Sequence, residues 1–377
     1  MPKKFWLIFI IIILTLASGC WGRIEVNQAA VLIGGGWDRA TSGRIMVTAQ
    51  TALASTNQPF TTVTAVGDTV SAAFRNTTLF SPRKQLPHHI TVHVLGEDMA
   101  GHLTDVLDLL VRAETIRETG DIFIARGATA REVLEVPTPI EKLPAQGLVS
   151  MIRTQDPGVG LYTEITIGEF LGKIAAPGVE PVIPGIEIVE EQPGKKRLQL
   201  SGMAVIKKGK LVGWLNEPES RGYRWLRPKR IRGGIKILPS PVGGKPVALE
   251  TLRAKSKIKP EIDSKGRIIM SIDIRETANF YEERDTDNLL TPENLKRLEQ
   301  AGSRQIEQEV LAAVKKAREL DSDIFGFGLA LSRTYPREWK QIEPDWEHIF
   351  PTVEVKVDAQ SEIKRSGLLT RILTFKN

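Results

Sequence analysis

The sequence predicts an α+β fold with mainly antiparallel sheets, helices packed on them, and two to three domains. Two hairpin patterns carry this prediction: strands at 198–206 and 210–215 flank the turn 207–209, and a second pair of strands flanks 263–266. Helical patterns cluster after residue 291 and do not alternate regularly with strands, which argues against a Rossmann-like fold or the fold of a solute-binding protein. The 377 residues allow two or three domains.

The N-terminal half shows short elements whose apolar residues follow either a period of two or one helical face. The first strand is expected to end in a tight turn at Gly34-Gly35-Gly36, and Asp68 is expected to cap the first helix. The expected strands are at 21–37, 44–53, 89–95 and 121–125. The expected helices are at 68–79, 97–111, 129–134, 145–152 and 167–175.

The C-terminal half has longer and cleaner patterns. Thr291 is followed by proline and glutamate, which together open a long helix whose apolar stripe continues to Ala317. A second helix is expected to begin at Ser322 or Asp323, within the run DIFGFGLALSRTYPREW, which we expect to pack a helix tightly on the sheet. The last strand, at 353–363, alternates apolar and polar residues.

The proline-rich stretch 176–193 suggests a boundary near 193–197, where new strands begin. We therefore divide the chain into a leader at 1–19, an N-terminal α+β region at 20–195 and a C-terminal α+β domain at 196–377.

Composition and charge exclude several classes of protein. With 41% apolar and 25% charged residues, the chain is typical of folded domains. The net charge of +6 is a mild excess that says little about nucleic acid. A single cysteine excludes an internal disulfide and a cysteine zinc cluster.

The first 19 residues read as an export signal. A positive start ending at Lys4 precedes 13 uncharged, mostly apolar residues, which as a helix would span roughly 20 Å, short of the bilayer core. Ala17-Ser18-Gly19 then lies directly before Cys20 and resembles the bacterial lipobox, in which the cysteine sulfur receives a diacylglyceryl group. We predict that Cys20 is lipidated. A cleaved signal with an incidental cysteine, or an uncleaved anchor, stays open as the alternative.

Residue patterns predict no catalytic, cofactor-binding or metal-binding residues. The glycine triplet lacks the Gly-Lys-Ser/Thr ending of a phosphate loop, and the sequence contains no Gly-x-Ser-x-Gly elbow. The acid pairs at 190–191 and 282–283 are interpreted as solvated. Four histidines have no carboxylate at a ligand-like spacing: His88, His89, His93 and His102.

A basic run at 221–232 (RGYRWLRPKRIR) interleaves arginines with two aromatic residues. Export argues against nucleic acid as its partner. A basic face near anionic headgroups and a plain solvated edge both stay open.

Several segments resemble the Ger(x)C proteins, the C subunits of spore nutrient germinant receptors. The resemblance covers the whole mature chain and is densest from residue 200 on. The stretches that carry it are Cys20-Trp21, 200–226, 255–262, 323–339 and 345–369.

This resemblance implies a membrane lipoprotein on the outer face of the spore inner membrane, anchored through Cys20. It implies assembly with an A subunit and a B subunit, both integral membrane proteins, in a complex that responds to nutrients and triggers germination. It implies no catalytic residues and no cofactor. The family fold has three domains, so we expect a break within 20–195, near 112–120.

Two other functions stay open from the residues alone. A solute-binding lipoprotein of a transporter predicts two similar α/β lobes around a cleft. A lipid-anchored hydrolase that acts on cell wall predicts a polar cleft with an acid pair of shifted pKa.

Overall fold

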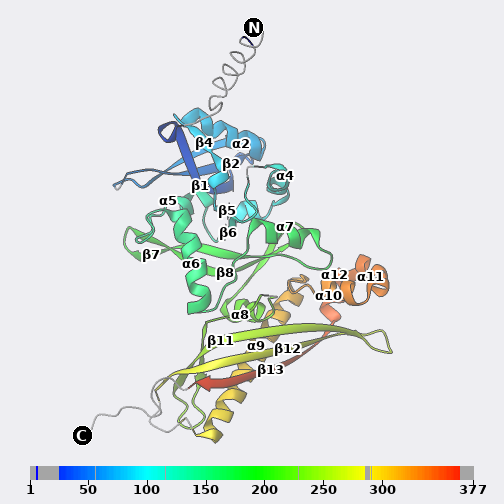
Figure 1. Cartoon of the computed structure of the whole chain (residues 1–377). Helices are drawn as coiled ribbons and strands as arrows, with labels where there is room; N and C mark the ends of the chain where they lie inside the picture. The colour runs from blue at the N-terminus through cyan, green and yellow to red at the C-terminus, as the bar shows by residue number, and fades with distance from the viewer. Residues whose placement is uncertain are drawn as a thin grey trace, which may run out of the picture.

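The computed structural model describes residues 25–55, 57–114, 116–227, 229–284 and 291–365, together with Trp6 and Leu289. The described residues form two sheets, one toward each end of an elongated body (Figure 1). Apart from Trp6, the predicted leader and Cys20 lie outside the described residues. The predicted α+β class is confirmed, with helices packed on both sheets.

The larger sheet has the strand order β3-β2-β1-β5-β6-β7-β8-β9, with β4 beside β1. Its two ends are antiparallel, whereas β1, β5, β6 and β7 run parallel in the middle. The sequence pattern predicted mainly antiparallel sheets and did not indicate this parallel core. The strands are β1 (Ala29–Arg39), β2 (Ile45–Ala52), β3 (Phe60–Gly67), β4 (Lys84–Leu86), β5 (Val92–Gly96), β6 (Asp121–Ala125), β7 (Val182–Gln192), β8 (Lys195–Lys207) and β9 (Lys210–Leu215).

Helices cover both faces of the larger sheet. On one face, Val92 and Val94 of β5 pack in a core with Leu134 and Leu148. The opposite face belongs to a separate core that includes Leu95. The helical segments of this half are η1 (Val26–Gln28), α2 (Val70–Asn76), η2 (Thr77–Phe80), η3 (Pro87–His89), α3 (Glu97–Ala100), α4 (Thr104–Arg112), α5 (Ala130–Glu135), α6 (Pro144–Gly158) and α7 (Ile167–Ala175).

The glycine triplet lies inside β1 and does not form the expected turn. A Cβ on Gly34 would lie 2.9 Å from the Cβ of Ala145, and one on Gly36 would lie 3.0 Å from a methyl of Leu134. The glycines therefore allow α5 and α6 to pack directly on the strand, which is a packing role and not a turn role.

Four other local predictions for this half were wrong. Thr69, not Asp68, caps α2, because its hydroxyl accepts the N–H of Ala72. The helix expected at 97–111 is divided into α3 and α4, and His89 lies in η3 instead of a strand. The proline-rich stretch contains β7, in which Pro184 falls beside a bulge in the pairing with β8.

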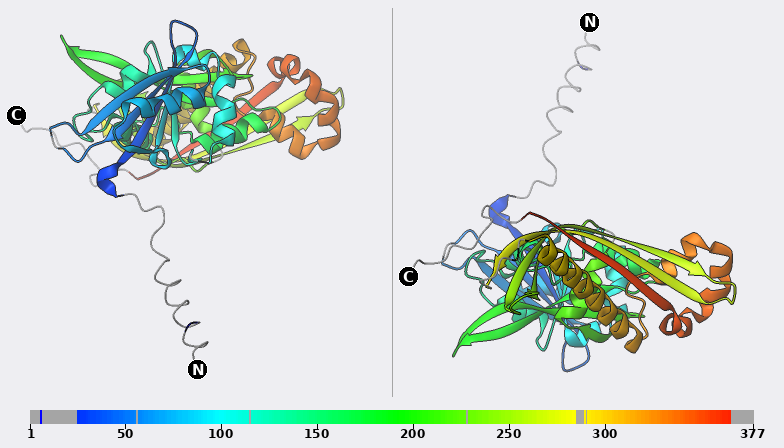
Figure 2. Two further views of the ribbon diagram at one scale, coloured as in Figure 1. Left: turned by 90° about the horizontal axis from the view of Figure 1, so that it is seen from above. Right: turned by 90° about the horizontal axis from the view of Figure 1, so that it is seen from below.

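The smaller sheet has the order β10-β11-β12-β13, and β13 runs parallel to β12. The long helix α9 lies along one face of this sheet (Figure 2). The strands are β10 (Ile235–Pro239), β11 (Pro246–Ile262), β12 (Ile268–Glu283) and β13 (Glu354–Arg365). The helical segments are α8 (Glu217–Trp225), α9 (Pro292–Glu319), α10 (Phe327–Thr334), α11 (Pro336–Ile342), η4 (Glu343–Asp345), α12 (Trp346–Ile349) and η5 (Phe350–Thr352).

The prediction for α9 is confirmed in detail. The hydroxyl of Thr291 accepts the N–H of Asn294, and the apolar stripe is buried from Leu298 to Ala317. The stripe packs against alternate residues of β12. The same core also contains Val92 of β5 and Leu148 of α6, which belong to the larger sheet and its helices. One continuous core therefore connects the two sheets.

The predicted division at 195/196 and the break near 112–120 stay predictions. The division at 195/196 falls after the first residue of β8, which pairs with β7 in the larger sheet.

Candidate functional site

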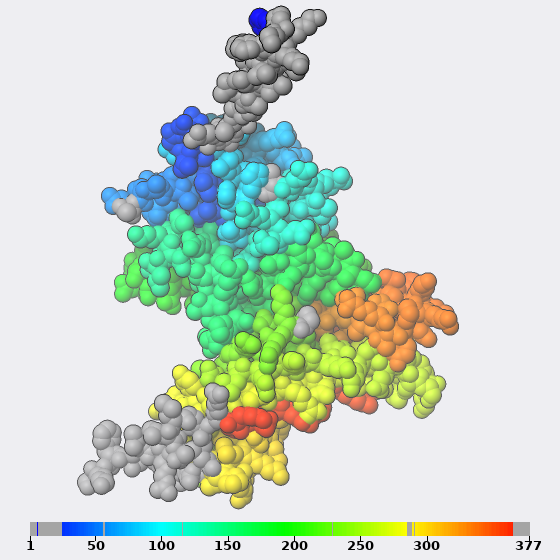
Figure 3. All heavy atoms as spheres, viewed as in Figure 1, coloured from blue at the N-terminus to red at the C-terminus, as the bar shows by residue number. Residues whose placement is uncertain are grey.

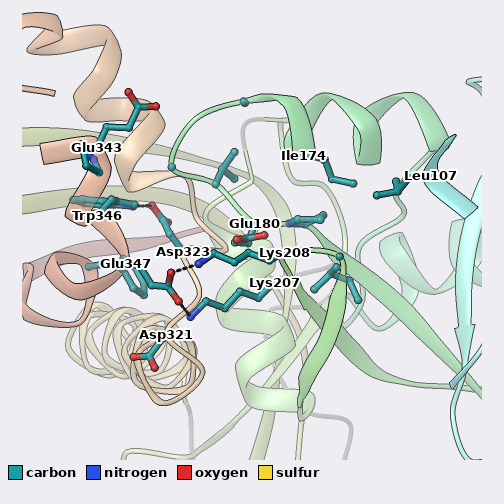
Figure 4. A pocket seen from close by; sticks show the side chains of 18 of the residues that line it. Leu107, Ile174, Glu180, Lys207, Lys208, Asp321, Asp323, Glu343, Trp346 and Glu347 are labelled. Carbon is teal, nitrogen blue, oxygen red and sulfur yellow. Dashed lines mark hydrogen bonds and ion pairs between the residues drawn. The ribbon is translucent and has the colours of Figure 1, made fainter. Parts of the chain in front are cut away.

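A cavity of about 450 Å³ opens where the larger sheet meets the C-terminal helices (Figure 4). One wall comes from α4, the end of α7, the segment 176–181 and the turn between β8 and β9. The other wall comes from Asp321, Asp323, α11, η4, α12 and Phe350. We call the larger sheet with its helices and the smaller sheet with the C-terminal helices the two lobes. The cavity lies between these lobes, and we call its two walls the lobe junction.

Glu347 of α12 bridges the two walls. It forms ion pairs with Lys207 and with Lys208, whose Nζ lies 2.5 Å from a carboxylate oxygen of Glu347 (Figure 4). Hydrogen bonds from the two lysines lower the pKa of Glu347 to about 2. The hairpin turn holds the lysines in place, because Lys208 and Gly209 both adopt positive φ, as a two-residue turn between twisted strands requires.

Asp323 organises the other wall from within. Its carboxylate accepts the backbone N–H groups of Gly326, Phe327 and Gly328 at 2.8 to 3.0 Å, and the indole N–H of Trp346 at 3.1 Å. These bonds fix the start of α10 and orient α12. Burial raises the pKa of Asp323 to about 6 against the opposing effect of these donors, so the side chain is ionised at neutral pH.

The segment 176–181 contacts the same wall directly. A Cβ on Gly178, which has φ +59°, would lie 2.6 Å from the Cα of Gly328. The N–H of Glu180 donates to the carbonyl of Asp323 at 2.7 Å, and burial raises the pKa of the Glu180 carboxyl. Only residues without side chains at these two positions allow such a close approach of two backbones.

The lobe junction is thus suited to couple the two lobes mechanically. Its ion pairs, its backbone bond and its glycine contact each join a segment before residue 210 to a segment after residue 320. A displacement of α12 relative to the β8–β9 turn would break the ion pairs of Glu347, and a displacement of the start of α10 relative to the segment 176–181 would break the backbone bond and the glycine contact. The junction can therefore transmit a conformational change between the lobes.

A second contact between the lobes uses the basic run. Arg224 is 1% exposed, and its Nε donates to the Asp156 carboxylate at 2.7 Å. Its Nη2 donates to the carbonyls of Asp156, Arg232 and Gly233 at 3.0 to 3.2 Å. Arg227 pairs with the same carboxylate at 2.9 Å.

These two arginines form neither a basic face for anionic headgroups nor a solvated edge, the two roles that the sequence had suggested. Their guanidinium groups instead bind a carboxylate and backbone carbonyls within the protein. Arg221 likewise pairs with buried Glu309. Lys229, Arg230 and Arg232 keep exposed side chains.

The histidines do not form a site in the described part of the chain. His93 is buried against Trp37, with ring centroids 5.7 Å apart, and burial lowers its pKa to about 4. His88 and His89 are exposed. Within the described ranges, no group of three His, Cys, Asp or Glu side chains is arranged to hold a metal ion. In the same ranges, no helix has the length and apolar character needed to span a membrane.

Comparisons with known proteins cover almost the whole chain. A family model described as the spore germination protein N-terminal domain matches residues 22–188, and one described as spore germination B3/GerAC like, C-terminal, matches residues 201–367. Spore germination protein KC of Bacillus subtilis is 26% identical, over 93% of this chain and 92% of that protein. Spore germination protein B3 of the same organism is 24% identical, over 97% and 98%.

A solved structure has a similar fold. The crystal structure of the GerBC protein superposes with a TM-score of 0.57 at 20% identity, over 88% of this chain and 96% of that one. At this identity the likeness describes the fold alone.

Proposed function

This chain belongs to the family of spore germination B3/GerAC-like proteins, and from this membership we propose that it is the lipid-anchored, non-enzymatic C subunit of a spore nutrient germinant receptor. The observation that carries the proposal is the match of both halves, in order, to proteins named for spore germination. The anchor is the lipid on Cys20, and the site of action is the outer face of the spore inner membrane.

The proposed role is to bind and couple the integral A and B subunits of the receptor. The lobe junction supports a coupling role, because its contacts link the segments 176–181 and 207–208 to the C-terminal helices α10 and α12. In this role the chain changes the response of the complex to nutrients without a chemical step of its own.

Labelling with a fatty acid tests the anchor. Cells that express the wild-type chain with labelled palmitate should yield a labelled protein whose N-terminus is Cys20, and Cys20→Ala should abolish the label. Ser18→Ala serves as the matched control, since it keeps a small residue before the cysteine and should be acylated normally. A Cys20→Ala chain with unchanged label and N-terminus would refute the anchor.

Purification from spore membranes tests the assembly. A tagged chain, extracted in mild detergent from dormant spores, should recover the A and B subunits of one receptor. Spores that lack the gene should lose the optical-density drop caused by the nutrient of that receptor. Recovery of neither subunit, together with an unchanged germination response in the deletion, contradicts the proposal.

A further inference from the structure

Exposed apolar side chains gather at the end of the larger sheet where the described chain begins. Val26 in η1 is 86% exposed, and Leu79 and Phe80 in η2 are 79% and 65% exposed. β1 and β4 run parallel, with Ala29 opposite Lys84. Val26 and Phe80 precede these two partners by three and four residues, so both project past the same end of the sheet.

Exposed basic side chains lie within five residues of Leu79 and Phe80 in the chain. Between Thr69 and Gly96 the sequence contains no aspartate or glutamate, and Arg75, Arg83 and Lys84 are exposed there. Glu25, beside Val26, is an exposed acid at this end. Figures 1 and 3 place α2, β4 and the start of β1 at the end of the molecule opposite the smaller sheet. We call Val26, Leu79, Phe80, Arg75, Arg83 and Lys84 the entry-end patch.

The length of the chain before this patch limits where a membrane can lie. Cys20 precedes Glu25 by five residues, which span at most about 18 Å when fully extended. An acylated Cys20 therefore keeps the start of η1 within that distance of the lipid headgroups. Exposed apolar side chains accompanied by basic residues are the chemistry that binds an anionic bilayer surface.

We propose that the entry-end patch docks on the bilayer, with Leu79, Phe80 and Val26 among the lipids and the basic side chains on anionic headgroups. The proposal rests on the lipid anchor proposed above and adds an orientation to it. The patch fixes the larger sheet against the membrane, and the smaller sheet extends away from it. Without the patch, the short tether alone would let the body rotate freely.

The single cysteine of the sequence makes a direct test simple. With Cys20 acylated, Leu79→Cys carries the only free thiol of the full-length chain. Leu311→Cys is the matched control, because Leu311 is an exposed leucine (47%) on α9 of the other lobe. Both proteins are labelled with a polarity-sensitive fluorophore and reconstituted in vesicles of phosphatidylcholine with phosphatidylglycerol. Their emission is then quenched with a nitroxide lipid or with aqueous iodide.

The label at position 79 should be quenched by the lipid nitroxide and protected from iodide, and the label at 311 should behave in the opposite way. Reversing the charges of Arg83 and Lys84 to glutamate should lower the docked-to-undocked ratio at least ten-fold, because each basic side chain near an anionic surface contributes roughly a five-fold factor. The same reversal at Lys255 and Lys257, exposed on β11, should leave the ratio unchanged.

Flotation of the same vesicles separates the two proposals. Protein that floats with the vesicles but shows equal iodide quenching at 79 and 311 overturns the docking and leaves the anchor intact. Protein that does not float overturns both. Docking that is as strong in pure phosphatidylcholine overturns the assignment of the basic residues to anionic headgroups.

Discussion

The clearest test of the connection between the lobes is Arg224→Met. This change keeps most of the apolar stem of the side chain and removes a guanidinium that is 1% exposed. Asp156 then loses its bond to Nε at 2.7 Å, and three carbonyls lose a donor, from Asp156, Arg232 and Gly233. Burial lowers the pKa of Arg224, which reflects the cost of holding the charge there, but the group stays charged at neutral pH.

The magnitude follows from these bonds. A hydrogen bond between charged groups contributes about 1.5–3 kcal/mol, and each bond to a carbonyl contributes up to about 1 kcal/mol here. Asp156 keeps its pair with Arg227 at 2.9 Å, so its charge is not left entirely alone. We expect a loss of about 4 kcal/mol in the free energy of unfolding, within the range of about 3–5 kcal/mol for breaking a buried ion pair, and a fall in Tm of roughly 5 °C for a chain of this length.

The assay is thermal unfolding of the full-length chain in mild detergent, followed by circular dichroism. Arg230→Met is the control, because it removes an exposed arginine of the same basic run and should change stability by less than about 0.5 kcal/mol. We call the contact of Arg224 with Asp156 and the three carbonyls the Arg224 clamp. Equal melting temperatures for Arg224→Met and Arg230→Met would refute the stabilising role of this clamp. Arg224→Lys should recover little, since a lysine ammonium cannot reproduce the planar fork of the guanidinium.

The remaining predictions concern the pH dependence of the lobe junction. Burial raises the pKa of Asp323 from its ordinary value near 3.8 to about 6. The protonation of Asp323 therefore adds to the free energy of unfolding fully below pH 3.8, and this addition is lost as the pH rises through about 6. In a series of urea midpoints measured against pH, Asp323→Asn should remove this decline. Glu347 has the opposite sign, since its pKa is lowered to about 2: its contribution is present above pH 4.5 and is lost as the pH falls through about 2. Glu347→Gln should therefore lower the free energy of unfolding by about 0.5–1 kcal/mol at pH 7. Equal urea midpoints of the variant and the wild type at pH 7 would contradict a stabilising role for the ion pairs of Glu347.

The sequence predicted the C-terminal half better than the N-terminal half, for a physical reason. β13 and α9 each bury one face, so their apolar residues follow a period of two or of 3.6, as the burial of their residues shows. β5 and β6 lie inside a parallel core and are buried on both faces. Such strands show no alternation, and their order cannot be predicted from local pattern.

The lobe junction was invisible in the sequence because its partners are far apart in the chain. Glu347 meets a turn about 140 residues earlier, and no local pattern links the two. The position of Asp323 could have been recognised from the sequence. It precedes Gly326 by three residues, which is the spacing at which a capping side chain accepts a backbone N–H. The helix was expected to begin at Asp323 or Ser322, and α10 begins at Phe327, because the carboxylate binds the N–H groups ahead of the first turn.

The continuous core and the two lobe contacts decide how a signal could cross this protein. The entry-end patch belongs to the larger sheet, and the smaller sheet lies at the other end of the body (Figure 1). A change that begins at the membrane can reach the smaller sheet only through residues shared by both lobes, which include the Arg224 clamp and the Glu347 bridge. The clamp is buried, whereas the bridge is partly exposed and contributes little stability. The bridge is therefore the contact that can open at low energetic cost while the clamp keeps the lobes together.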